Sequence, residues 1–564
     1  MGLTKLSPAE TRALDQPFVE AGSLDGLHSR LPLPWPTPAD LPPSPKRRYR
    51  SRYYYQGWAD LDASTDWEHL SDFDLVLRLV DFEGLRPLLA SLLGWTSPRG
   101  RIPFDPVSIF LFLAWQLVNQ WNRATALRKL ANPRYADYRQ RFGFHQDLPT
   151  EGGIRHFLTT LGANSTAADN PISVQVKEKE WVEIAAQRLN ELLAASVALI
   201  RDVGLVSPEA WDRALVCPDG MIHDAASRMR CTYVKDPCYH PIAADQPRAC
   251  PAKEKGKAGC ACDTPACVLS CRRAPIRDPE ARSVYYAGNN QAPAEPELDT
   301  QEEKGELRYG YRSLVLQLAD PQRRFSLVLL DDFLPANARE ENPSAAFLLQ
   351  LERFYPTLQL DVVAGDAGLG YFSYLHVAYQ LGAKRVVDLR ADPNDKVKSE
   401  WLVRGYNHQG RPVCEFGYAL TANGYDAQRR RHKWFCAQAC RKGAIPLVEK
   451  SGTTYPPLEC PYLTPNRPHG KIVNVAETFP NGSIRLARDV PFASPTWKRL
   501  YHRARNASEW RNSQLEAWRL KRLPVYGQAR GRALIALADV WLNLTTLGRL
   551  VRQATAAAHG PPGR

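Results

Sequence analysis

The spacing of apolar residues predicts helices in the first third of the chain. From residue 70 to 165 apolar side chains recur at helical intervals, and the pattern breaks at Asn132-Pro133 before it resumes. The segments 158–168 and 175–203 are also predicted to be helical. The sequence therefore predicts an all-helical N-terminal domain, with most of its aromatic residues in the core.

From Arg213 onward the apolar residues form short runs, which indicate buried strands. Residues 214–220 predict one strand, and residues 308–320 and 324–333 predict a hairpin with its turn at 321–323. The next elements alternate: a helix at 343–355, a strand at 358–366, a helix at 371–381 and a strand at 384–390. This succession predicts an α/β fold with one mixed sheet. Residues 496–552 are expected to be mainly helical, with an interruption near Pro524.

Composition divides the chain into five segments. Residues 1–65 are Pro-rich and basic, 66–205 form the helical domain, 206–395 the first part of the α/β core, 396–495 a Cys-bearing insertion, and 496–564 the C-terminal helical part. A Cys-rich stretch at about 225–300 predicts another insertion within the core. Residues 29–55 fit either a solvated linker or a basic arm that follows a DNA backbone.

The net charge of the chain is +13, which favours an anionic partner. Nucleic acid is the commonest such partner of a soluble protein. The longest apolar run, residues 109–118, is shorter than the stretch of about 20 residues that spans a bilayer. The N-terminus lacks the apolar core of a signal peptide. We therefore expect a cytoplasmic protein.

Three acidic residues stand where a metal-dependent nuclease needs them. Asp219 and Asp366 each follow an apolar strand and lie beside glycines, and Glu509 lies in the C-terminal helical part. Strand ends in α/β sheets commonly carry ligand groups, and glycine lets a bulky substrate come close. Two such aspartates and a helical glutamate could hold two divalent metal ions and cut a phosphodiester. For either aspartate alone, the capping of a turn is the alternative.

Motifs around these acids occur in a specific order. They are a helical segment at 103–144, VCPDGM around Asp219, GYRSLVLQLAD followed by FLPANARE, VVAGDAGLGYF around Asp366, and Arg-x3-Glu-x2-Asn around Glu509. Together they cover most of residues 70–552 and resemble the DDE transposases of bacterial insertion sequences. One departure is that Glu516 stands where many relatives have lysine. Lys521 could replace that lysine, and Glu516 is a weaker rival for the third acid.

The resemblance implies an RNase H-like core with a DNA-binding helical domain before it. It implies that Asp219, Asp366 and Glu509 are catalytic and bind Mg²⁺ or Mn²⁺. The implied reaction is metal-dependent cleavage and strand transfer at the ends of an insertion sequence. The implied partners are terminal inverted repeats and target DNA, bound by a homodimer or larger synaptic complex near the bacterial nucleoid.

Two groups of cysteines lie in the two expected insertions. One group is Cys260, Cys262, Cys267 and Cys271, and the other is Cys414, Cys436, Cys440 and Cys460. Each could hold a structural Zn²⁺, which would staple a segment with little apolar area of its own. Reduced thiols are the alternative in a reducing compartment.

Two basic groups are candidates for contact with DNA phosphates. The first lies in the run 429–434, and the second surrounds Glu509; the candidates are Arg430, Lys433, Arg503, Arg505, Arg511 and Lys521. A solvated surface is the alternative interpretation for the first group.

The sequence leaves three functions open. The leading one is a DDE transposase. The second is a catalytically inactive, zinc-stapled DNA-binding protein derived from such an enzyme. The third is a host nuclease of the same fold.

Overall fold

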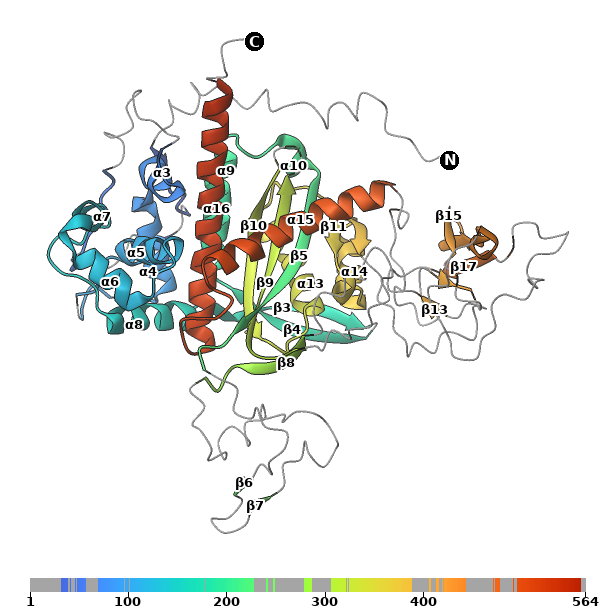
Figure 1. The fold of residues 1–564 in the computed structure, drawn as a ribbon, viewed down its shortest axis with the longest axis horizontal. Coiled ribbons are helices and arrows are strands. Elements are labelled where there is room, and N and C mark those ends of the chain that lie inside the picture. Colours follow the sequence, from blue (N-terminus) through green and yellow to red (C-terminus); the bar gives the residue numbers. More distant parts are fainter. Residues whose placement is uncertain are drawn as a thin grey trace.

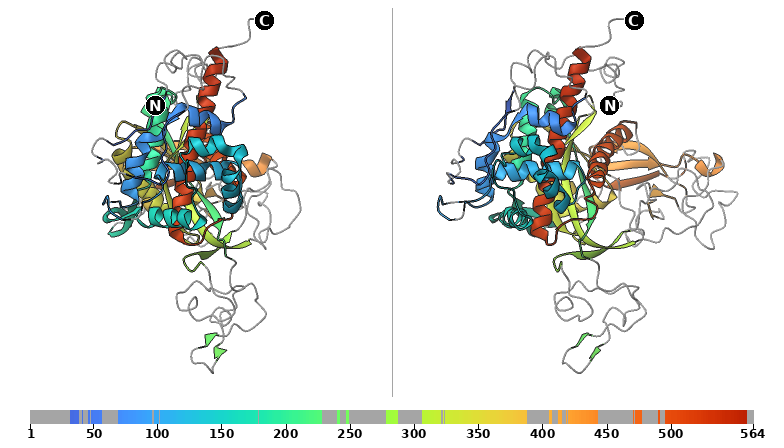
Figure 2. Two further views of the ribbon diagram at one scale, coloured as in Figure 1. Left: turned by 90° about the vertical axis from the view of Figure 1, so that its left-hand side faces the viewer. Right: turned by 60° about the vertical axis from the view of Figure 1, so that its left-hand side comes forward.

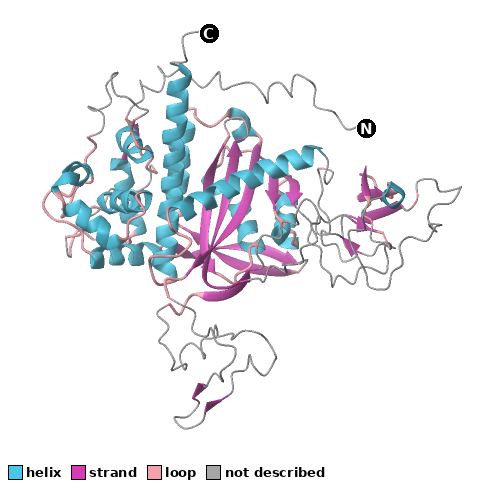
Figure 3. Cartoon of the chain, in the orientation of Figure 1, coloured by secondary structure: helices cyan, strands magenta, loops and turns pink. Residues whose placement is uncertain are grey.

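In the computed structural model a mixed sheet is flanked by helices, and a helical domain lies beside it (Figures 1 and 3). The described residues are 32–38, 41, 46, 48–56, 69–95, 97–100, 102–177, 179–227, 240–241, 247–248, 278–286, 306–320, 322, 324–387, 405–406, 412–414, 418, 420–442, 470, 472–476, 490 and 495–558.

The central strand of the sheet is β5 (Ala214–Asp224). On one side of it, β9 (Glu306–Asp320) and β10 (Phe325–Pro335) form an antiparallel hairpin, and β8 (Arg282–Tyr286) pairs with β9 as well. On the other side, β11 (Leu360–Gly365) and β12 (Lys384–Val387) run parallel to β5. This arrangement confirms the prediction of an α/β fold with a mixed sheet and the predicted hairpin.

Successive residues of a strand point to opposite faces of the sheet, and the core divides accordingly. Val216 and Val363 belong to the large core cluster, which includes residues of α13 (Glu341–Phe354) and α14 (Phe372–Gln380). Cys217 and Val362 belong to a second cluster with residues of α15 (Pro495–Ala517). Figure 1 shows α15 crossing the sheet. The odd-numbered residues at the start of β5, and therefore Asp219, share a face with α15.

Among its described residues, the first part of the chain forms helices, as predicted: α3 (Asp72–Leu79), α4 (Leu85–Leu92), α5 (Pro106–Val118), α6 (Arg123–Ala131), α7 (Ala136–Arg141) and α8 (Glu151–Ala163). The predicted break at Asn132-Pro133 is a short 3₁₀ turn between α6 and α7. Side chains with oxygen atoms cap several of these helices; Ser71, for example, accepts a hydrogen bond from the Asp74 amide (3.0 Å). Two further helices follow in the described residues. They are α9 (Asn190–Asp202), which is as long as α5 and α8 and lies within the expected helical domain, and the short α10 (Pro208–Asp212).

The prediction of an all-helical N-terminal domain is wrong for residues 166–187. They form an antiparallel hairpin of β3 (Thr166–Lys177) and β4 (Glu180–Gln187). The reason is a period of two: Ile172, Val174 and Val176 lie on one face of β3 and reach the core. Pro171 also disfavours a continuous helix at this point.

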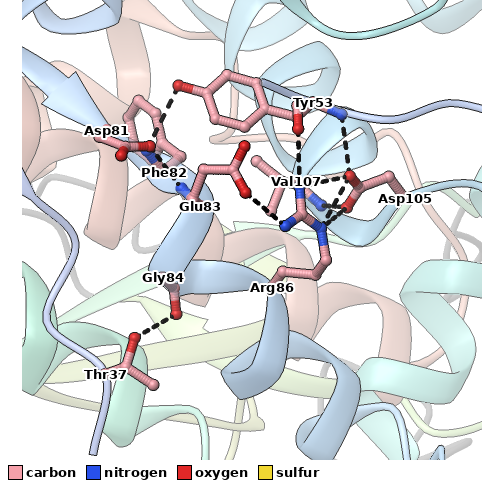
Figure 4. A network of polar contacts seen from close by, with 9 residues as sticks. All are labelled: Thr37, Tyr53, Asp81, Phe82, Glu83, Gly84, Arg86, Asp105 and Val107. Atoms are coloured by element: carbon pink, nitrogen blue, oxygen red, sulfur yellow. Dashed lines mark hydrogen bonds and ion pairs between the residues drawn. The ribbon is translucent and has the colours of Figure 1, made fainter. Parts of the chain in front are cut away.

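A buried ion pair ties the segment before α3 to the helical domain (Figure 4). Asp105 caps α5 by accepting from the Val107 amide (3.1 Å), and it also accepts from both Arg86 and the Tyr53 amide. Arg86 in turn donates to the Tyr53 carbonyl (2.8 Å). Leu33 and Tyr53 are 2% and 3% exposed, so parts of the expected N-terminal segment 1–65 belong to the core of the helical domain. The short strands β1 (Leu33–Pro34) and β2 (Val80–Asp81) pair there.

The C-terminal helix α16 (Gln528–Ala558) joins the helical domain to the sheet. It packs against α3, α5, α8 and α9, and also against β10 (Figure 2). The centroid of its Trp541 ring lies 4.9 Å from the ring centroid of Phe73 and 6.1 Å from that of Phe110. The helical domain and one face of the sheet consequently share a single hydrophobic core.

By length and composition, residues Gln528–Ala554 of α16 could cross a membrane. This stretch is longer than residues 109–118, the longest uninterrupted apolar run in the sequence. However, 94% of its most apolar window is buried inside the fold. Burial by the protein itself is the behaviour of a core helix, so α16 carries no argument for a membrane span.

The two expected insertions are described only in part. In the second one, β15 (Thr421–Asp426), β16 (Arg431–Phe435) and β17 (Ile472–Ala476) form an antiparallel sheet, and β13 (Gly405–Tyr406) pairs with β14 (Pro412–Val413). In the first one, β6 (His240–Pro241) pairs with β7 (Pro247–Arg248).

The crossing of α8 and α16 gives a test of this packing. A methyl group at Gly162 would overlap the backbone carbonyl of Ala529 on α16. We expect Gly162→Ala to destabilise the protein by about 1–3 kcal/mol, because two helix backbones must separate. Urea denaturation measures the change. Gly152→Ala on the same helix is the control, since its methyl group meets nothing closer than 3.9 Å, and it should be neutral or slightly stabilising.

Candidate active site

Asp219 lies within β5 and not at its end, which corrects the sequence-based expectation. β5 continues to Asp224, and Asp219 pairs with Val315 of β9. On its other side β5 pairs with β11 only through residues 214–216. The pairing of β5 with β11 has therefore ended before Asp219, so this residue lies at the edge of that pairing, with its side chain 12% exposed.

Asp366 follows β11 directly and so lies at this same edge. The Gly368 amide donates to its Oδ1 atom (2.9 Å), which holds the carboxylate at the start of a 3₁₀ turn. Asp366 is close enough to Asp219 for its charge to raise the pKa of Asp219. The structure therefore brings together two of the three predicted acids.

Helix α15 supplies two partners for the Asp219 carboxylate. Arg505 donates to Oδ1 (3.2 Å) and Asn512 donates to Oδ2 (2.7 Å). The two residues are seven apart, about two helical turns, so they lie on one face of α15. Asn512 was not predicted as a contact, although the Arg-x3-Glu-x2-Asn pattern contained it.

Glu509 stands apart from the two aspartates. Its side chain is 55% exposed, and it pairs with Arg505 at 3.6 Å. Arg505 thus contacts Asp219 and Glu509 at once. Within the described ranges, no three His, Cys, Asp or Glu side chains are grouped closely enough to hold a metal ion. The rival Glu516 forms an exposed pair with Lys521 (2.8 Å).

Burial raises the pKa of Asp219 above its ordinary value, and Asp366 raises it further, while Arg505 and Asn512 act in the opposite direction. The same two aspartates raise the pKa of Arg505, whose charged form they stabilise. The edge of the sheet is therefore a site of concentrated negative charge that a cation stabilises.

Glu340 is a further acid that sequence reasoning missed. It precedes α13 and forms an ion pair with Arg312 of β9. A methyl group at Gly220 would lie 2.8 Å from its Oε1 atom, so the carboxylate rests against the residue after Asp219. The FLPANARE segment contains Glu340, but nothing in its local pattern indicates where the carboxylate lies.

Arg511 is a structural residue, which contradicts the prediction that it contacts DNA. It is fully buried and donates to both oxygens of Asp539 on α16 (2.9 and 2.7 Å). It also donates to Ser313 of β9 (3.0 Å). Ser313 then donates to Nε2 of His223, whose Nδ1 donates to the Leu520 carbonyl (2.8 Å). This network joins α15, α16, β9 and β5 beneath the site.

The other predicted DNA contacts lie nearer the surface. Arg503 is half-buried, Lys521 is exposed, and Arg430 donates to the Tyr379 hydroxyl on α14 (3.1 Å). Lys433 pairs with Asp426 inside the small sheet (3.4 Å). Their role in DNA binding remains a prediction.

Only some of the cysteines in the predicted zinc sites lie within the described residues. Cys414, Cys436 and Cys440 all adjoin the second hydrophobic cluster, while Cys460 lies outside the described residues. Cys436 accepts a hydrogen bond from the Gln438 amide (3.3 Å). The whole first group, Cys260, Cys262, Cys267 and Cys271, lies outside the described residues.

Comparison with known proteins adds no assignment: no protein-family model matches the chain, and no curated protein matches it.

The buried pair predicts a large loss of stability when one partner is removed. We expect Arg511→Met to lower the free energy of unfolding by about 3–5 kcal/mol, because Asp539 is left as an uncompensated buried charge. The double variant Arg511→Met/Asp539→Leu should recover much of this loss. Equal destabilisation of the single and double variants in urea titrations would contradict the account.

His223 predicts a specific dependence of stability on pH. Burial lowers its pKa from 6.5 to about 3, so the folded protein keeps the ring neutral while the unfolded chain takes up a proton below pH 6.5. Stability is therefore lost as the pH falls from 6.5 towards 3, by about 1.4 kcal/mol per unit. His223→Gln keeps a donor and an acceptor without this titration. Between pH 7.5 and 5, the wild type should lose about 2 kcal/mol relative to this variant.

Proposed function

We propose that this protein is a DDE transposase that cleaves DNA and transfers strands at the ends of an insertion sequence. One observation carries the proposal. Asp219 and Asp366, from neighbouring parallel strands, lie close together where the pairing of these strands ends, and Arg505 and Asn512 of α15 bind Asp219. Three of the five motifs on which the family resemblance rests, those around Asp219, Asp366 and Glu509, are thus close to one another in space, although they lie far apart in the sequence.

The sheet supports an RNase H-like core as part of this proposal. Three antiparallel strands, β10, β9 and β5, continue into the parallel strands β11 and β12, and α15 crosses the sheet next to the two aspartates. A mixed sheet of this kind places both acids at neighbouring strands, which a two-metal site requires.

The oxygen donors of the site fit Mg²⁺ or Mn²⁺. Carboxylates suit such hard cations, and the mutual repulsion of Asp219 and Asp366 favours binding of positive charge. A pair of divalent cations would activate a water or a 3′-hydroxyl and stabilise the leaving oxygen. Asp219 and Asp366 would hold them, and Glu509 would join once its ion pair with Arg505 is released.

Basic residues around the site supply candidate contacts to DNA. Arg503 and Lys521 belong to the α15 region that crosses the sheet, and Arg430 lies against α14 through Tyr379. They would bind phosphates of terminal inverted repeats and target DNA, which the overall charge of +13 favours. Joining two ends requires at least a dimer.

Zinc in the second insertion is part of the proposal. Cys436 and Cys440 lie four residues apart, Cys414 comes from a separate segment of the insertion, and all three adjoin the same apolar cluster. With Cys460 they would form a four-thiolate site that fastens the small sheet to the core.

The proposal predicts metal-dependent nicking that needs both aspartates. The substrate is a plasmid carrying the DNA that flanks the gene, incubated with Mg²⁺ or Mn²⁺. We expect Asp219→Asn and Asp366→Asn each to slow nicking by about a thousandfold or more, because each loses several kcal/mol of stabilisation of the transition state. Asp212→Asn, the same change at an exposed residue at the end of α10, is the matched control.

The outcomes separate the three candidate functions. Nicking followed by joining to target DNA supports the transposase. Nicking without joining indicates a nuclease, and salt-sensitive DNA binding without metal-dependent nicking indicates an inactive DNA-binding protein. Undiminished nicking by Asp219→Asn would show that the catalytic assignment is wrong.

A further inference from the structure

Helix α8 carries a polar stripe that meets two other helices. Glu151, Arg155 and Thr159 recur every four residues and therefore lie on one face of α8. Further along this face the backbone of α8 touches the first turn of α16, because a methyl group at Gly162 would overlap the Ala529 carbonyl. Figure 1 shows the start of α16 beside α8, and α6 packs against α8 as well. The stripe therefore lies at a junction of three helices.

Each of the three helices contributes one arginine to this junction. Arg530 of α16 donates through Nε to the Thr159 hydroxyl (2.9 Å). Arg155 of α8 pairs with Glu151 at 3.4 Å, and both of these side chains are more than half exposed. Arg123 of α6 faces the same group, because the charges of Arg155 and Arg530 both act on it. We call Arg123, Arg155 and Arg530 the arginine cluster.

The arginine cluster carries an excess of positive charge. Burial lowers the pKa of Arg123, and the nearby charges of Arg155 and Arg530 lower it further. Glu151 acts in the opposite direction, but its side chain is exposed, so solvent screens its charge. The Nε atom of Arg123 is buried and has no hydrogen-bond partner in the described part of the chain. The fold thus holds mutually repelling cations together and leaves a buried donor unused.

Asp278 is a second acid near the cluster, but its oxygens are bonded elsewhere. Its charge and that of Arg530 act on each other. One oxygen of this carboxylate accepts from the Tyr311 hydroxyl, and the other accepts from the Gly527 amide (3.1 Å). Asp278 therefore offsets the charge of Arg530 only from a distance.

The position of Arg123 in α6 adds to the excess of positive charge. Arg123 is the first residue of α6, directly after the N-cap Asn122, and this end of a helix carries a partial positive charge. A basic residue is unfavourable there, whereas a bound anion is favourable. The sequence of α6 contains no acidic residue, and its other charged residues are Arg128 and Lys129. An anion beside Arg123 would therefore stabilise both the helix and the cluster.

We propose that Arg123, Arg155 and Arg530 together bind a phosphate group of the DNA backbone at the junction of α6, α8 and α16. Guanidinium groups match the oxygen geometry of phosphate and keep their charge at physiological pH. Arg155 is more than half exposed, so a long duplex can reach the cluster from solvent. The inference rests on the proposed function for the choice of DNA as the partner. This contact is additional to the basic residues of α15 and carries no base specificity.

The test is the affinity of the purified full-length protein for a labelled DNA duplex of arbitrary sequence, measured by fluorescence anisotropy in metal-free buffer at several salt concentrations. Each phosphate that the protein neutralises contributes about 0.9 to the slope of log affinity against log salt concentration. We expect Arg123→Gln/Arg155→Gln to make this slope shallower by about 0.9, so that binding is about eightfold weaker at about 0.1 M salt. Arg213→Gln/Arg353→Gln removes two exposed arginines elsewhere and is the matched control, which should keep the wild-type slope.

Thermal melting separates phosphate binding from a purely structural role. In a buffer of low ionic strength without phosphate or DNA, Arg123→Gln should melt at the wild-type temperature or above it, because one of three repelling charges is gone. Arg123→Lys keeps the charge and should restore most of the salt slope. A lower melting temperature of Arg123→Gln together with an unchanged slope would show that Arg123 only supports the fold.

The outcomes separate this inference from the proposed function. If Arg123→Gln/Arg155→Gln keeps the wild-type slope, the cluster does not contact the DNA backbone, whatever the result of the nicking assay. If inorganic phosphate raises the melting temperature of the wild type but not of Arg123→Gln, while the slope is unchanged, the occupant is free phosphate and not DNA. If the wild type binds no duplex, the inference and the proposed function are both wrong. A shallower slope combined with undiminished nicking by Asp219→Asn would support the inference and overturn only the catalytic assignment.

Discussion

The buried ion pair between Arg511 and Asp539 is the interaction on which the candidate site depends. Both side chains are fully inaccessible, so each charge has lost its hydration and is compensated by the other, and Arg511 also donates to Ser313. Such a pair need not make the protein more stable than apolar residues at the same positions would. However, replacing only one partner strongly lowers the free energy of unfolding, because the other charge is left buried and uncompensated. It therefore fixes where α15 lies relative to α16. Arg511 also donates to Asn512 (3.2 Å), which in turn donates to Asp219. The position of α15 therefore determines where the Asp219 carboxylate is held.

The second constraint is the unequal length of the two central strands. β11 pairs with β5 only as far as Val216, although β11 itself continues to Gly365, whereas β9 pairs with β5 along nearly its whole length. Asp219 is therefore held through β9 on one side, while no strand pairs with it on the other side. An ordinary strand end would give access without this rigidity. The proposed catalytic role of Asp219 would require both, because small displacements of a reacting group are costly.

How far the sequence predicts this arrangement depends on how far apart in the sequence the interacting residues lie. The apolar run before Asp219 and the hairpin β9–β10 were predictable because strand patterns are local. The β3–β4 hairpin was missed because residues from 175 onward were interpreted as a helix, so the alternation at Ile172, Val174 and Val176 was not used. Arg511 was misassigned although a local signal exists: Ala504, Ser508, Arg511 and Leu515 follow helical spacing and are all buried. Glu340 had no such signal, since its contact with Gly220 joins segments 120 residues apart (340 − 220).

The charges at the edge explain why two arginines accompany the acids. Burial and the charge of Asp366 raise the pKa of Asp219, and burial and the charges of both aspartates raise the pKa of Glu340, so these acids oppose folding at neutral pH unless positive charge is nearby. Arg505 compensates Asp219, and Arg312 compensates Glu340, from opposite faces of the sheet. Arg505 also holds Glu509 at the protein surface. A divalent cation at the edge would compete with Arg505 for Asp219, and any release of Arg505 would free Glu509 at the same time. Arg505 thus balances the charge of Asp219 when no cation is bound, and its release would link cation binding to the movement of Glu509, the proposed third acid.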